Sequence, residues 1–228
     1  MKRAWLYTTL LLCNLACGAR EQEVLQQADL QPAPQPSMPS AAAQVWQASY
    51  AAEAAGKLED ALNQLTQLPP PQRDSYLASY RRGWLQYRMG RYADSAGAYN
   101  MAAALEPTGV EARVAMLVSL SAEKRWDDVI STAQGVLKRD PENYNALTRL
   151  AFAHYSLQHW EDAEPLYRKL LQRYPSDVEA RSSLGWTLIR MGKQKEAAEL
   201  FRQVLELSPS HAIATAGYRA ANGRKGAL

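Results

Sequence analysis

Cysteine is nearly absent from this chain of 228 residues, and the two that occur, Cys13 and Cys17, lie close to its start. The rest of the chain therefore has no disulfide and no cysteine-rich metal site. A glycine-rich phosphate loop and a nucleophile elbow are also absent from the sequence. The sequence accordingly predicts neither an enzyme nor a cofactor.

Histidine is scarce as well, with His154, His159 and His211 in all. His154 falls on the core side of an expected helix, His159 in a turn, and His211 before the last helix. Because His154 and His159 are five residues apart, we expect them to point to different faces, unlike the two ligands at i and i+4 of a helical metal site. The sequence therefore predicts no metal site and a core role for His154.

Neither sign of charge is in large excess, since the chain has 26 basic and 23 acidic residues. Lys2 and Arg3 belong to a leader, and without these two the count is 24 against 23, a net charge of +1. A nucleic-acid-binding surface needs a basic patch or stripe. The charge therefore argues against a nucleic acid as partner.

The apolar run from Ala4 to Leu12 is shorter than the roughly 20 residues that span a bilayer. Lys2 and Arg3 precede it and Leu15-Ala16-Cys17-Gly18 follows, as in a secretory signal. Leu15-Ala16-Cys17 resembles a bacterial lipobox, with Asn14 where an aliphatic residue is usual. The resemblance implies a signal peptide over residues 1–17 and lipidation of Cys17.

Gly18 after the cysteine then implies an outer-membrane lipoprotein that faces the periplasm. The alternative is ordinary cleavage after Gly18 or Ala19, which would release a soluble periplasmic or secreted protein. Residues 18–41 are rich in Gln and carry four prolines between Pro32 and Pro39. Such a composition is typical of a semi-rigid tether.

Four later prolines are each 34 residues from the next, and an amphipathic run precedes each: Pro107, Pro141, Pro175 and Pro209. Since proline cannot continue a helix, each marks a point beyond a helix end. A period of 34 predicts helix-turn-helix repeats. Extended back once, it gives units 42–75, 76–109, 110–143, 144–177 and 178–211, with glycine at the expected turn in three: Gly56, Gly90 and Gly192.

The residues of these units resemble the tetratricopeptide repeat family. The last unit carries the family's spacing of large, small and aromatic residues in Leu184-Gly185, Leu188, Gly192, Ala197, Phe201, Val204 and Pro209. The resemblance covers about three quarters of the chain and implies an all-α, right-handed solenoid of about five units. A capping helix is expected within residues 212–228, with Ser210 as its N-cap.

The small residues Gly83, Ala151 and Gly185 are expected where the two helices of a unit cross. The 110–143 unit departs from the family pattern. It has Leu117 where a small residue is usual and Ala133 where an aromatic one is usual, which suggests an exchange of volume.

The resemblance also implies that a stripe on the first helices lines a concave groove. Tyr50, Trp84, Val118, Phe152 and Trp186 occupy one column of it at 34-residue spacing. The alternative is that these side chains pack between neighbouring first helices. The predicted partner-binding residues are Trp46, Tyr50, Tyr80, Trp84, Tyr87, Arg88, Val118, Phe152, Tyr155, Trp186, Ile189 and Arg190.

Together these features favour a non-catalytic protein-binding scaffold in a bacterial cell envelope. We expect this scaffold to bind a peptide or helix of an envelope component and to reach the membrane only through a lipid anchor. The layout is similar to that of tetratricopeptide lipoproteins that assist assembly of type IV pilus secretins. The alternatives are a structural module that self-assembles through its open ends, and a soluble adaptor without lipid. The oligomeric state stays open.

Overall fold

The computed structural model describes residues 40–223. The predicted signal peptide, Cys17, most of the tether and the tail from 224 lie outside these residues. The chain divides into two compact units after Ser40, and the unit that begins at Ala41 is the one described. No strand occurs among the described residues, and none of their helices is long and apolar enough to cross a membrane.

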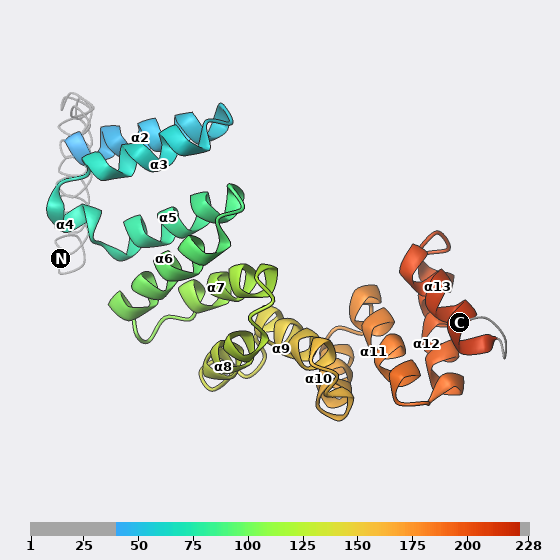
Figure 1. Cartoon of the computed structure of the whole chain (residues 1–228). Helices are drawn as coiled ribbons and strands as arrows, with labels where there is room; N and C mark the ends of the chain where they lie inside the picture. The colour runs from blue at the N-terminus through green and yellow to red at the C-terminus, as the bar shows by residue number, and fades with distance from the viewer. Residues whose placement is uncertain (1–39, 224–228) are drawn as a thin grey trace, which may run out of the picture. The chain divides into compact units, whose positions relative to one another are not determined.

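From Ala41 to Asn222 the chain forms helical hairpins that follow one another in chain order (Figure 1). Each helix packs against the next, within a hairpin and between hairpins. This arrangement confirms the predicted all-α solenoid. The first helices are α2 (Ala41–Ala54), α5 (Tyr76–Arg88), α7 (Glu111–Ala122), α9 (Tyr144–Ser156) and α11 (Val178–Arg190), and their partners are α3 (Leu58–Gln64), α6 (Tyr92–Leu105), α8 (Trp126–Leu137), α10 (Trp160–Arg173) and α12 (Gln194–Leu207).

The second helices end before the regularly spaced prolines. α6, α10 and α12 each end two residues before their proline, while α8 ends at Leu137, four residues before Pro141. In the first unit α3 ends early and is followed by the 3₁₀ helix η1 (Leu65–Gln67) and the short helix α4 (Pro70–Arg73). The run Pro69-Pro70-Pro71 thus truncates the second helix of this unit, as predicted.

The five hairpin turns share one backbone conformation. Gly56, Gly90 and Gly192 have φ of 75°, 76° and 76°, and Lys124 and Gln158 take the same position with φ of 58° and 64°. A residue with a side chain loses about 1 kcal/mol or more in the left-handed region, whereas glycine does not. The turn therefore forms without glycine, but at a cost to stability.

We expect Gly90→Ala to lower the free energy of unfolding by about 1 kcal/mol, since alanine at φ of 76° is strained. Gly97→Ala is the matched control, because it lies within α6 and a Cβ at either glycine meets no atom within 4 Å. Alanine favours a helix interior, so the control should gain about 0.5–1 kcal/mol. Urea denaturation measures both changes, and a gain at both positions would contradict the account of the turns.

Small residues do lie where the helices of a hairpin cross. A Cβ at Gly83 would come within 2.8 Å of the Tyr99 ring, and one at Gly185 within 2.7 Å of the Phe201 ring. In the third unit Leu117 and Ala133 are both fully buried in one apolar cluster. This pairing agrees with the predicted exchange of volume.

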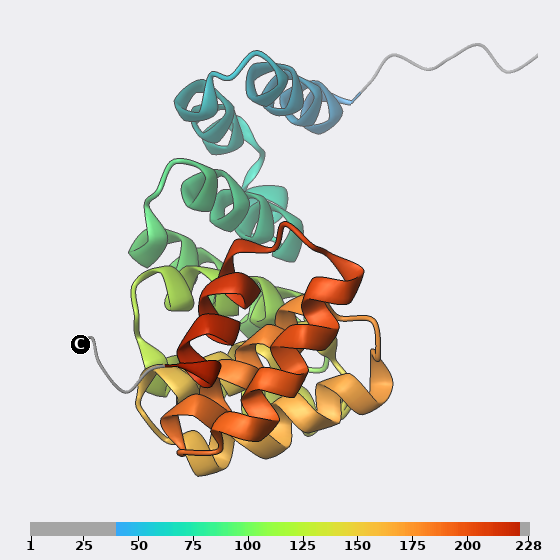
Figure 2. The ribbon, with the colours of Figure 1, turned by 90° about the vertical axis from the view of Figure 1, so that its right-hand side faces the viewer.

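The last helix, α13 (Ala212–Asn222), packs against α11 and α12 and covers the C-terminal end of the core (Figures 1 and 2). The predicted N-cap, Ser210, is wrong. The turn after Pro209 extends one residue further, and the Nδ1 atom of His211 accepts a hydrogen bond from the Ala214 backbone N–H at 3.1 Å. The imidazole nitrogen thus replaces the hydroxyl oxygen of an ordinary cap.

Candidate functional site

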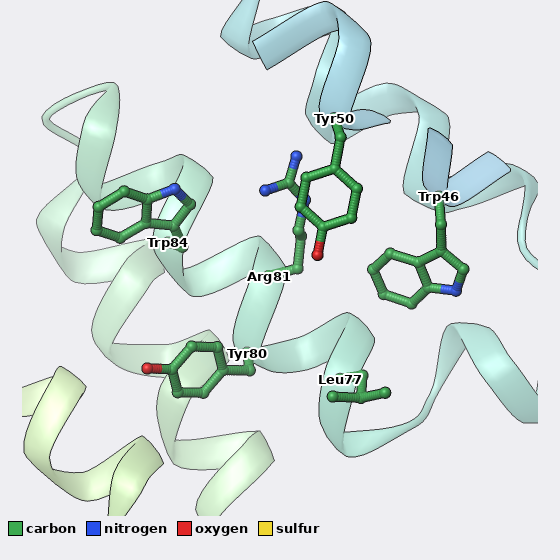
Figure 3. A pocket seen from close by; sticks show the side chains of 6 residues that line it. All are labelled: Trp46, Tyr50, Leu77, Tyr80, Arg81 and Trp84. Carbon is green, nitrogen blue, oxygen red and sulfur yellow. The ribbon is translucent and has the colours of Figure 1, made fainter. Parts of the chain in front are cut away.

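Four of the predicted groove residues meet at a pocket of about 360 Å³ between α2 and α5, the first helices of adjacent repeats. Figure 3 shows side chains from α2 and from α5 facing one another across it. Residues at i and i+4 lie on one face of a helix, which is why each helix contributes such a pair. The pocket is lined by Trp46 and Tyr50 from α2 and by Leu77, Tyr80, Arg81 and Trp84 from α5.

The pocket presents apolar surface to solvent. Tyr50, Leu77 and Trp84 are 55%, 66% and 39% exposed. The ring of Trp46 stacks with that of Tyr50 at 6.5 Å between centroids, and Tyr80 contacts the buried Tyr99 edge-on at 5.1 Å. The aromatic walls are therefore held by packing while their outer faces stay accessible.

Glu53 organises the charges beside the pocket. Its carboxylate accepts hydrogen bonds from Nη1 of Arg81 at 2.6 Å, from the Trp84 indole N–H at 2.8 Å and from Nη1 of Arg88 at 3.2 Å. The Arg81 guanidinium lies 3.8 Å from the centre of the Tyr50 ring and also donates to the Ser49 hydroxyl. This network fixes Trp84 and Tyr50 relative to each other.

The Trp84 indole and the two guanidiniums together favour the ionised form of Glu53. Burial raises the pKa of this carboxyl. Hydrogen bonds from Trp84 and Arg81 and the charges of Arg81 and Arg88 together lower it by a larger amount, so the pKa lies below its ordinary value of 4.5. Glu53 is therefore ionised at neutral pH. Two arginines against one carboxylate leave the site with one net positive charge.

Comparison with known proteins agrees with this architecture. Residues 148–212 match the family described as tetratricopeptide repeat. The array has the fold of a tetratricopeptide-repeat solenoid. No curated protein matches the chain by sequence.

Solved structures resemble the array in fold. MamA from Desulfovibrio magneticus superposes with a TM-score of 0.70 and 21% identity, over 77% of this chain and 99% of that one. YrrB, described as a tetratricopeptide protein with an unusual peptide-binding site, gives 0.66 and 13%, over 77% and 90%. A tetratricopeptide protein from Parabacteroides merdae gives 0.71 and 18%, over 77% and 70%. At these identities the similarity establishes the fold alone.

The rest of the predicted groove column of the tetratricopeptide array divides in two. Tyr87 and Arg88 border the N-terminal pocket, where Tyr87 stacks with Trp84 at 6.4 Å. Phe152 and Tyr155 form a separate aromatic group with Trp126 and Trp160. Tyr87 and Tyr155 are partly exposed, and Phe152 is 41% exposed.

The C-terminal part of the column is used for packing. Trp186 contacts Phe201 edge-on at 5.7 Å, and both Trp186 and Ile189 pack on the C-terminal core cluster. Val118 is half-buried, and Arg190 is exposed on α11, four repeats from the first. The groove interpretation thus fits the N-terminal repeats, and the packing interpretation fits Trp186 and Ile189.

Sequence reasoning missed three residues of the pocket region: Glu53, Leu77 and Arg81. The helical spacing contained a signal for all three. Glu53 follows Tyr50 by three residues, Leu77 precedes Tyr80 by three, and Arg81 precedes Trp84 by three, so each shares a helix face with a predicted residue. The ion pair between Glu53 and Arg81 joins different repeats, so spacing within one helix could not predict it.

The expectation that His154 and His159 point to different faces is wrong, because their ring centroids lie 5.9 Å apart. The expectation applied helical spacing across the turn, but α9 ends at Ser156 and the chain reverses at Gln158 before α10 begins. The Nδ1 atom of His154 is buried and has no hydrogen-bond partner within the part of the chain described. Burial lowers the pKa of His154, outweighing the raising effect of Asp162.

Proposed function

We propose that this protein is a non-catalytic scaffold that binds a peptide or helix of another protein at the N-terminal end of its tetratricopeptide array. The observation that carries the proposal is the pocket between α2 and α5, which is open, lined by aromatic side chains and bordered by an ordered ion-pair network. Aromatic and arginine side chains supply most binding energy at protein interfaces. An exposed apolar patch of this kind also marks an interaction site.

The chemistry of the pocket favours a ligand with an apolar anchor and a nearby acidic group. An aliphatic or aromatic side chain would pack on Tyr50, Tyr80 and Trp84 and displace water from their exposed faces. Arg88 is about half-exposed while it pairs with Glu53, so it can also contact a ligand carboxylate. The net positive charge of the site supports the same preference.

No catalytic role is needed to explain the carboxylates that cluster near the hairpin turns. Asp127 and Asp128 lie in the first turn of α8, and Glu161 and Asp162 in that of α10. Acidic groups there interact favourably with the helix dipole. The peptide-binding site for which YrrB is described also supports a binding role on this fold.

We expect Trp84→Ala to weaken partner binding by about 30-fold or more, the effect of removing a hot-spot residue worth 2 kcal/mol. Leu207→Ala is the control, because Leu207 is 63% exposed at the end of α12 and is not among the predicted partner-binding residues. Crosslinked co-purification followed by quantitative mass spectrometry compares the two variants with the wild type. Equal recovery of the partner by wild type and Trp84→Ala would refute the assignment of the pocket.

We also propose, on the sequence of residues 1–41, that Cys17 is lipidated and that the array is tethered to the outer membrane facing the periplasm. In this arrangement the scaffold would assist assembly of an envelope complex such as a pilus or secretion system. The alternative is a soluble periplasmic or secreted adaptor. Metabolic labelling with a palmitate analogue decides between them: wild type should be labelled and Cys17→Ser should not, whereas an unlabelled wild type would favour the alternative.

Self-assembly through open ends is less well supported. α13 covers the C-terminal end of the core, and its Gly217 packs directly on the Phe201 ring. Stacking that uses the C-terminal end of the array would require this helix to leave.

A further inference from the structure

The turn between α9 and α10 brings two histidines together by backbone geometry. The His159 N–H donates to the His154 carbonyl at 2.9 Å, and the Gln158 N–H donates to the Tyr155 carbonyl at 3.0 Å. With Gln158 in the left-handed region, these bonds form a Schellman motif. The side chains at the positions of His154 and His159 commonly touch in this motif, which explains the short distance between the two rings.

Asp162 completes a group of three potential ligands. His159 is the residue that precedes α10, and Asp162 is the third residue of that helix, so its side chain can reach back toward the turn. Its Oδ2 atom lies 3.8 Å from Nδ1 of His154, the buried nitrogen that lacks a hydrogen-bond partner. One ligand atom from each of the three residues lies within 4.8 Å of the other two.

The other four turns show which part of this group is unusual. Each forms the same pair of backbone hydrogen bonds, and each has an acidic residue at the position of Asp162: Asp60, Asp94, Asp128 and Glu196. The acidic residue is therefore a general feature of the hairpin. The pairs at the two histidine positions are Ala52 with Lys57, Gln86 with Arg91, Leu120 with Arg125, and Leu188 with Lys193.

Only the fourth turn thus replaces a cation by an imidazole and also places a second imidazole beside it. At Arg125 the cation pairs directly with Asp128 at 2.7 Å. An ion bound by His154, His159 and Asp162 would occupy the place of that guanidinium, next to the acidic residue. With such an ion bound, the turn would keep a positive charge, carried by the metal in place of the guanidinium.

We propose that His154, His159 and Asp162 bind a divalent transition-metal ion of the zinc class. Two imidazoles and one carboxylate suit zinc, copper or nickel, whereas magnesium and calcium prefer oxygen ligands alone. Zinc bonds to nitrogen and oxygen are about 2.0–2.2 Å long, so ligand atoms around one ion lie about 3.5 Å apart. Small rotations of the exposed His159 and Asp162 side chains bring the three atoms to that separation.

The proposal is tested by zinc titration of the full chain, purified without an affinity tag, with isothermal calorimetry and thermal unfolding as readouts. We expect one Zn²⁺ per chain with a dissociation constant in the micromolar range or below, and a rise in the thermal midpoint on binding. His154→Leu and His159→Arg should each weaken binding at least tenfold. Both substitutions copy residues found in the third repeat, Leu120 and Arg125, so the hairpin should still fold.

His211→Asn is the control, because asparagine preserves the helix cap and removes the one histidine outside the group. Its zinc affinity should equal that of the wild type. The alternative is that His154 and Asp162 only form a hydrogen bond with each other. In that case the wild type would not bind zinc at submillimolar concentration. That result, or binding unchanged in both His154→Leu and His159→Arg, would overturn the proposal.

Discussion

Phe201→Ala is expected to lower the free energy of unfolding by about 3–5 kcal/mol, the range for removing a fully buried aromatic ring. Phe201 has no exposed surface and lies between two glycines, Gly185 on α11 and Gly217 on α13. A Cβ at Gly217 would come within 2.2 Å of the ring, so no side chain is available to fill the cavity. Chemical denaturation followed by circular dichroism measures the loss.

Phe152→Ala separates the effect of burial from that of losing a phenylalanine. Phe152 is the other phenylalanine of the chain and is 41% exposed, so its replacement should cost about 1 kcal/mol or less. Equal losses at Phe152 and Phe201 would contradict the assignment of Phe201 as the residue that joins α13 to the array.

Glu53→Ala is expected to cost about 3 kcal/mol at neutral pH. The Arg81 side chain is almost completely buried, and its partner Glu53 is mostly buried. Removing one member of a buried pair leaves an uncompensated charge, which is far more costly than losing an exposed pair. Glu59→Ala is the matched control, since the Glu59–Arg91 pair at 2.9 Å is about half-exposed and should contribute less than 1 kcal/mol.

The cost of Glu53→Ala should depend on pH in a defined direction. The folded state lowers the pKa of Glu53 below 4.5, so its stabilising contribution is complete above that pH and is lost as the pH falls through the lower folded value. The stability difference between wild type and Glu53→Ala should therefore shrink as the pH is lowered below about 4.5. A difference that stays constant to the acid unfolding limit would show that the ion pair contributes nothing.

The repeat architecture could be predicted because it depends on local rules. Proline spacing located the helix ends, and Gly56, Gly90 and Gly192 located three of five turns. The 34-residue spacing also predicts turns at Lys124 and Gln158. Their left-handed conformation could not be predicted, since each residue type disfavours it and the surrounding hairpin imposes it. The same conformation at Gln158 brings His154 and His159 together, which helical spacing alone could not foresee.

The binding surface could be predicted only in part, because exposure depends on the neighbouring helix. Trp84 and Trp186 hold equivalent positions in their repeats, yet Trp84 keeps an exposed face while Trp186 packs against Phe201. The difference arises from residues outside the column. Glu53 on α2 and Arg81 on α5 likewise form a pair between repeats that no periodic pattern contains.

Site-specific photocrosslinking tests the central claim most directly. Leu77 lines the pocket and is 66% exposed, while Leu207 is 63% exposed at the end of α12, so the two leucines form a matched pair for a photoreactive amino acid. We expect the probe at position 77, but not at position 207, to crosslink the partner protein, and expect Trp84→Ala to abolish the adduct. Equal crosslinking at both positions, or an adduct at 77 that Trp84→Ala does not change, would contradict binding in the pocket between α2 and α5.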